Sequence, residues 1–106
     1  MVERVVKVIN RAGIHARPSS LLVGLTKDFK SSIHFEQGKN RINAKSILGI
    51  ITLGAVYNSE IKIIAEGEDE QEAVERLSRL FESKFEEEES ANIQNTGNQR
   101  KWSPYR

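Results

Sequence analysis

The apolar residues of this chain recur with two different periods, and these divide its first 85 residues into seven segments. Alternating or β-prone runs, which are typical of strands, occupy residues 2–9, 31–36, 41–44 and 60–66. Apolar residues three and four positions apart, which are typical of a helix with one buried side, occupy residues 16–29, 46–53 and 69–85. The pattern therefore predicts the element order βαββαβα.

This order favours an α+β domain built from two layers. A sheet and a helix each need an apolar partner surface, so the economical arrangement is an antiparallel four-stranded sheet with three helices on one face, an open-faced sandwich. We expect the helices to bury the apolar side chains that share one side: Leu21, Leu22, Leu25, Phe29, Ala73, Leu77, Leu80, Phe81 and Phe85.

The composition of the chain changes after Phe85. Four consecutive glutamates, 86–89, are followed by a polar stretch in which Ile93 is the one large apolar residue before the basic end. Such a segment buries too little apolar surface to offset the entropy lost on ordering. We therefore predict one domain over residues 1–85 and a tail over residues 86–106 that is mostly disordered.

His15 stands at the junction between the first predicted strand and the first predicted helix. Gly13 gives the backbone the freedom for a sharp approach, and Pro18 fits the first helical turn, where a missing N–H is tolerated. A helix N-terminus is suited to holding a phosphate, and Arg17 adds a fixed positive charge. Taken alone, a histidine near a helix start is usually a cap or a surface residue. The whole constellation instead suggests a phosphohistidine.

The run Gly13-Ile14-His15-Ala16-Arg17-Pro18 resembles the phosphorylation-site motif of HPr, the histidine phosphocarrier family of the bacterial sugar phosphotransferase system. That family has the βαββαβα order, and the resemblance extends over residues 2–85. It implies that His15 carries the phosphoryl group and that Arg17 stabilises it.

A second motif opens the short predicted helix. Ser46 is a natural N-cap, because its hydroxyl can accept a backbone N–H of the first turn. The run Lys45-Ser46-Ile47 is also similar to the regulatory serine site of HPr proteins, and Ser46 lies 31 residues after His15, which is the separation in that family. The resemblance implies regulatory phosphorylation of Ser46. A phosphate there would lie at the positive end of the helix.

The short helix is apolar on two sides, and a two-layer domain can bury only one of them. Ile47, Leu48 and Ile51 share one side and Ile50 and Leu53 share the other, so we expect one of the two sides to stay exposed as a docking patch. In the HPr family this helix and the histidine loop together contact the partners. The expected partner-binding residues are Ala16, Ser20, Lys27, Lys45, Ile47, Leu48 and Ile51.

Some residues depart from the family pattern. Gly24 stands in the first helix where HPr proteins often have a basic residue, and glycine weakens a helix. The tail has no counterpart in the compact family. Its Trp102 and Tyr105 are either an anchor for a partner or incidental.

Charge and composition exclude several other classes. The 106-residue chain has a formal net charge of +1, so no strong field directs it to nucleic acid. It has no cysteine, which excludes disulfides and thiolate metal sites and fits a reducing cytoplasm. The charged N-terminus lacks a signal-peptide core, and the longest apolar stretch, 47–56, is too short to span a bilayer. We expect a cytoplasmic monomer without a metal or cofactor and without direct membrane insertion.

The resemblance implies a phosphocarrier rather than an enzyme, one that accepts a phosphoryl group from Enzyme I and passes it to a IIA protein. HPr kinase/phosphorylase and a catabolite-control transcription factor are possible further partners. The main alternative is a regulatory module without sugar transport, because the segment 80–86 resembles the ending of nitrogen-related HPr paralogues. The intact Lys45-Ser46 pair favours HPr proper. A purely structural protein is a third alternative, which the presence of His15 disfavours.

Overall fold

The computed structural model describes residues 1–85, and the predicted tail lies outside these described residues. The predicted element order is confirmed. The elements are β1 (Val2–Lys7), α1 (Ala16–Thr26), β2 (Ser32–Gln37), β3 (Asn40–Asn43), α2 (Ile47–Leu53), β4 (Glu60–Glu66) and α3 (Glu70–Glu82).

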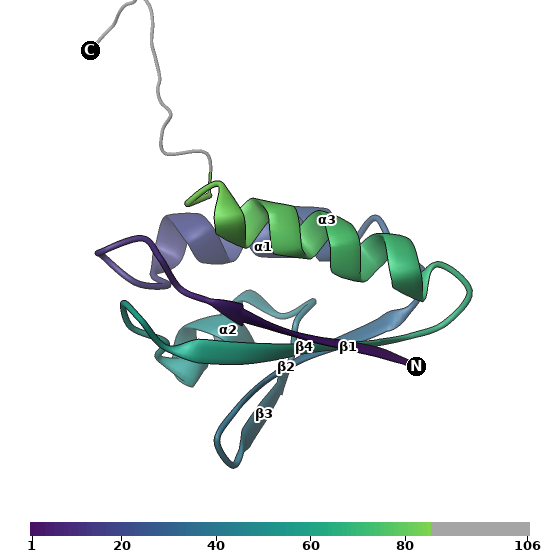
Figure 1. The fold of residues 1–106 in the computed structure, drawn as a ribbon, viewed down its shortest axis with the longest axis horizontal. Helices are drawn as coiled ribbons and strands as arrows, with labels where there is room; N and C mark the ends of the chain where they lie inside the picture. Colours follow the sequence, from purple (N-terminus) through teal and green to yellow (C-terminus); the bar gives the residue numbers. More distant parts are fainter. Residues whose placement is uncertain (86–106) are drawn as a thin grey trace, which may run out of the picture.

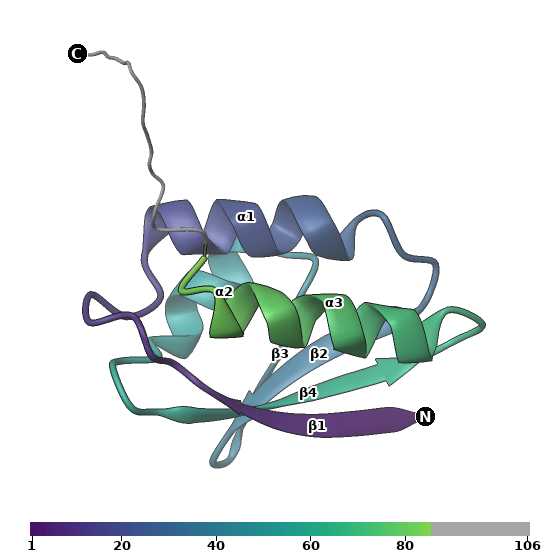
Figure 2. The ribbon, with the colours of Figure 1, turned by 45° about the horizontal axis from the view of Figure 1, so that its top comes forward.

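The four strands form one antiparallel sheet in the order β1-β4-β2-β3. In Figures 1 and 2, α1 and α3 lie side by side over one face of this sheet, and α2 lies beside α1 near the end where β1 leads into the first loop. Ile33, Phe35, Ile61 and Ile63 project from the sheet into the core. Burial of these side chains against the helices is the main source of stability. The chain is thus an α+β open-faced sandwich.

Two predicted helices end earlier than their apolar spacing indicates. The first ends at Thr26 rather than at residue 29, because the Thr26 hydroxyl donates to the Ala44 carbonyl oxygen at 2.8 Å and the chain turns there. The last ends at Glu82 rather than at residue 85. Lys84 and Phe85 have positive φ angles, and the Phe85 N–H donates back to the Leu80 carbonyl oxygen at 3.0 Å. This bond closes the helix in a Schellman-like turn.

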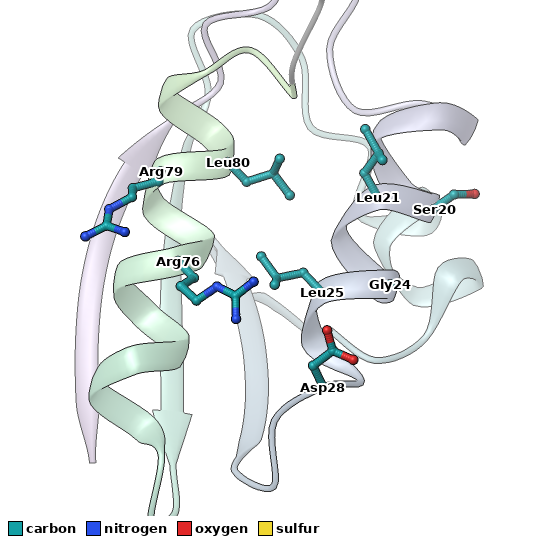
Figure 3. A pocket seen from close by; sticks show the side chains of 8 residues that line it. All are labelled: Ser20, Leu21, Gly24, Leu25, Asp28, Arg76, Arg79 and Leu80. Carbon is teal, nitrogen blue, oxygen red and sulfur yellow. The ribbon is translucent and has the colours of Figure 1, made fainter. Parts of the chain in front are cut away.

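The buried sides of α1 and α3 are narrower than predicted. Leu22 and Leu77 are fully buried, but Leu21, Leu25 and Leu80 pack against the core and stay partly exposed. These three leucines line a groove between the two helices (Figure 3). They are incompletely covered because nothing in the described part of the chain lies over that groove.

Asp69 joins the start of α3 to the loop before β2. Its carboxylate accepts the backbone N–H groups of Lys30 and Ser31, both at 2.9 Å, and also the Ser31 hydroxyl. The Ser31 hydroxyl bond, followed by the Lys30 N–H bond, lowers the pKa of Asp69 to about 2. Gly67 is required beside this clamp, because a Cβ there would lie 2.6 Å from the Ser31 Cα.

The Asp69 clamp predicts a loss of stability in acid. Because the folded-state pKa lies below the value of about 3.9 typical of an unfolded chain, the ionised carboxylate stabilises the fold above roughly pH 4. That contribution is lost as the pH falls towards 2. In urea unfolding at several pH values, Asp69→Asn should be less stable than the parent at pH 7, and the difference should shrink below pH 4. Equal parent–variant differences at pH 7 and pH 2.5 would contradict the clamp.

Candidate functional site

His15 lies at the N-terminal end of α1, where its side chain is exposed. The residue is the N-cap of the helix, with an extended backbone, and its carbonyl oxygen accepts the Ser19 N–H at 3.0 Å. The imidazole does not accept a capping hydrogen bond. The ring therefore stands exposed at the helix start without serving as its cap, so the capping role that the sequence alone left open does not apply.

The loop before His15 is held in place by hydrogen bonds to its backbone. The Asn10 side-chain amide donates to the Gly13 carbonyl oxygen at 2.7 Å, and the Ile14 N–H donates to the Ala55 carbonyl oxygen at 3.0 Å. Gly13 has a φ of +77°, and a Cβ there would lie 2.9 Å from the same Ala55 oxygen. The predicted need for glycine is therefore confirmed for two reasons, conformation and close approach. These contacts fix the position of His15.

The start of α1 is electrostatically suited to an anion. Its first turn contains no acidic residue, and Arg17 is exposed there, two residues after His15. The N–H groups of a first helical turn point out of the helix end and carry partial positive charge. Pro18 lies in the same turn, where its missing N–H is tolerated, and its side chain is buried. His15 and Arg17 thus flank a positively polarised helix end.

Ser46 is the N-cap of α2, as predicted. Its hydroxyl oxygen accepts the Gly49 N–H at 3.0 Å. A hydroxyl in this position stabilises a helix by about 1 kcal/mol relative to alanine. The capping role of Ser46 is therefore certain in this fold, and any regulatory role comes in addition to it.

The two-sided apolar pattern of α2 is resolved as predicted. Ile50 and Leu53 are buried in the core, with exposed fractions of 1% and 7%. Ile47, Leu48 and Ile51 are exposed by 43%, 71% and 42%. We call these three side chains the α2 patch. An apolar patch of this kind on a small domain is a candidate docking surface.

The remaining predicted partner residues divide into two groups. Ala16 and Ser20 are exposed on α1, and Lys27 is exposed at its C-cap. Lys45 is different, because its ammonium group donates to the Phe29 carbonyl oxygen at 2.8 Å. This bond, together with the one from Thr26 to Ala44, ties α1 to the segment that leads into α2. Lys45 thus serves to hold the His15 helix and the Ser46 helix together.

Sequence reasoning missed an aromatic contact beside the site. Tyr57 is exposed by 42%, and the Arg11 guanidinium carbon lies 5.4 Å from the centre of its ring. Val56, exposed by 62%, lies next to the Gly13 backbone. The segment after α2 thus continues the apolar surface beside the His15 loop. This surface depends on a long-range contact between residues 13 and 56, and a single sequence contains no signal that reveals such a contact.

No group of three or more histidine and acidic side chains suited to a metal ion occurs within residues 1–85. In the same residues, no helix combines the length and apolar character that crossing a membrane requires.

Comparison with known proteins identifies the family. Residues 2–83 match the family model described as the PTS HPr component phosphorylation site. The chain belongs to the HPr family. It is 46% identical over 88 residues to the phosphocarrier protein HPr of Treponema pallidum, covering 83% of this chain and all of that protein. The HPr-like protein Crh of Bacillus subtilis is 41% identical over 78 residues, covering 74% of this chain and 92% of Crh.

Solved HPr structures share the fold. The structure of HPr-C-His from Thermoanaerobacter tengcongensis matches with a TM-score of 0.80 and 44% identity, covering 83% of this chain and 99% of that one. HPr from the same organism is also known as a dimer, which matches with a TM-score of 0.65. The phosphocarrier role of the HPr family therefore applies to this chain, and its monomeric state stays a prediction.

Proposed function

We propose that this chain accepts a phosphoryl group on His15 from Enzyme I and passes it to a IIA protein of the sugar phosphotransferase system. The observation that carries the proposal is an exposed imidazole at a helix N-terminus, two residues from Arg17, in a chain of the HPr family. The proposed setting is the cytoplasm.

In the proposed transfer, the Nδ1 lone pair of neutral His15 attacks the phosphorus of a phosphohistidine on Enzyme I. A P–N bond forms to His15 as the P–N bond to the donor histidine breaks, and the donor nitrogen recovers the electron pair. Arg17 and the N–H groups of the first α1 turn stabilise the negative charge on the phosphoryl oxygens. The contribution of the chain is position and charge, because the phosphoramidate itself has a high transfer potential.

The α2 patch and the exposed side of α1 are the proposed docking surface for both partners. Ile47, Leu48 and Ile51 supply apolar area, and Arg17 and Lys27 supply positive charge at its edge. Such a surface suits acidic partners with an apolar centre. A direct test is phosphoryl transfer from the labelled chain to a purified IIA protein. Transfer on a time scale of seconds supports the carrier role, and labelling that never leaves the chain contradicts it.

A regulatory role is the second candidate, and the similarity of this chain to the HPr-like protein Crh supports it. In this role, HPr kinase/phosphorylase modifies Ser46, and a catabolite-control transcription factor reads the modified protein. The two candidates differ in the IIA experiment, because a purely regulatory module is not expected to pass phosphate to a IIA protein.

Ser46→Asp is expected to slow phosphorylation of His15 by Enzyme I while leaving the fold intact. The new charge lies at the start of α2 beside Ile47, where it repels an acidic partner and is costly to desolvate. Aspartate is also a good N-cap, so the melting temperature should stay equal or rise slightly. Initial labelling rates and thermal unfolding are the measurements. Labelling at the parental rate would reduce Ser46 to a helix cap.

A further inference from the structure

Apart from Ser20, the residues that line the groove between α1 and α3 have no part in the proposed phosphocarrier role. The groove has a volume of about 500 Å³, and its lining is more apolar than polar. Figure 3 shows Leu21 and Leu25 on α1 facing Leu80 on α3 across the gap, with Arg76 directed towards the gap from α3. Arg79 also lines the groove.

Gly24 leaves one wall of this groove bare. It lies inside α1, where glycine weakens a helix relative to alanine. Its φ angle is not positive, and a Cβ at this position would meet nothing within 4 Å. The fold of residues 1–85 therefore does not require glycine here. A side chain at position 24 would instead occupy space beside Leu21 and Leu25 that a groove occupant needs.

The described chain ends at one end of the same groove. The Phe85 N–H donates to the carbonyl oxygen of Leu80, and the Phe85 ring is fully buried with its centre 5.1 Å from that of Phe81. Phe85, the last described residue, is therefore held in place beside Leu80, which lines the groove. Twenty-one further residues follow, from 86 to 106.

The chemistry of the far end of the tail matches the lining. Trp102, the one tryptophan in the sequence, and Tyr105 are large flat side chains that suit a leucine-lined surface. A guanidinium group packs well on an aromatic face. Arg76 already does so on the inner side of the groove, with its guanidinium carbon 5.6 Å from the centre of the Phe29 ring.

The tail is also long enough. A flexible chain of 17 residues, from Phe85 to Trp102, has a typical end-to-end distance of about 20–25 Å. The 13-residue helix α3, which forms one wall, is about 20 Å long. A tether whose length matches the span gives an effective concentration on the order of millimolar, so even a weak contact is populated.

We propose that the α1–α3 groove is the docking site for the aromatic end of this chain's own tail, with Trp102 against Leu21, Leu25 and Leu80. The glycine at position 24 provides the space for the ring. Ser20 lines the same groove, so the docked tail reaches the edge of the proposed partner surface.

The tryptophan fluorescence of the full chain reports on the surroundings of Trp102 alone, since the sequence contains no other tryptophan. We expect its emission maximum to be shifted to shorter wavelength than that of N-acetyltryptophanamide, and its quenching by iodide to be weaker, because a docked ring is shielded from the solvent. Gly24→Gln adds a side chain to a lining position of the groove, where a Cβ would meet nothing within 4 Å in the described fold. In this variant the emission and the quenching should return to the values of exposed tryptophan.

Lys27→Gln, at the C-cap of α1 and outside the groove, is the matched control and should leave the fluorescence unchanged. Trp102→Ala provides a second measurement, in which the methyl NMR signals of Leu21, Leu25 and Leu80 should shift while those of the buried Leu77 do not. Far-UV circular dichroism verifies that each variant is folded. Parental emission equal to that of the free compound, unchanged fluorescence in folded Gly24→Gln, or unshifted leucine methyls in Trp102→Ala would each overturn the proposal.

Discussion

His15→Ala is expected to abolish phosphorylation by Enzyme I. The imidazole supplies the lone pair that forms the new P–N bond, and alanine has no nucleophile to replace it. The side chain is exposed and makes no capping hydrogen bond, so its removal should cost the fold little. The measurement is the amount of labelled protein formed from phosphoenolpyruvate and Enzyme I, compared with the parent.

The matched control for this prediction is His34→Ala. His34 is the second histidine of the chain, on β2, with its backbone paired to Asn43 and Ile64. The variant should be labelled to the same extent as the parent. If labelling survives in His15→Ala and disappears in His34→Ala, the phosphoryl group is carried by His34 and the assignment to His15 is wrong.

Arg17→Ala is expected to slow transfer without unfolding the chain. A charge-assisted contact with the phosphoryl group is worth about 1.5–3 kcal/mol, which corresponds to a roughly ten- to hundredfold decrease in rate. The loss should be largest at low salt, because Arg17 is exposed and its field is screened. Rapid-quench measurements of phosphoryl transfer from Enzyme I give the rate directly.

An exposed arginine far from His15 tests whether this effect is local. Arg4 lies on β1, and Arg4→Ala removes the same charge from the molecule. It should transfer phosphate at the parental rate. If Arg4→Ala is slowed as much as Arg17→Ala, the effect comes from net charge alone.

Much of the fold could be predicted from local patterns. Alternation and helical spacing predicted the seven elements, and the two-sided apolar pattern of α2 correctly predicted that one of its apolar sides is exposed. The capping role of Ser46 and the position of His15 at a helix start also followed from neighbouring residues. These features depend on contacts within one turn of helix or one strand.

The features that could not be predicted depend on contacts between distant residues. The end of α1 is set by the bond from Thr26 to Ala44, and the constraint on Gly13 comes from the backbone of Ala55. The ammonium group of Lys45 donates to the Phe29 carbonyl oxygen, 16 residues away in the sequence. No pattern along the chain encodes these pairs, because each joins segments that only the fold brings together.

The chemical stability of the labelled protein is the most direct test of whether His15 carries a phosphoryl group. The unmodified full chain is incubated with phosphoenolpyruvate and Enzyme I, and its intact mass is measured before and after brief treatment with acid or alkali. If His15 carries the phosphoryl group, the mass increases by one phosphate, which is lost in acid and retained in alkali because the bond is a phosphoramidate. No added phosphate, or a phosphate that survives acid, would contradict it.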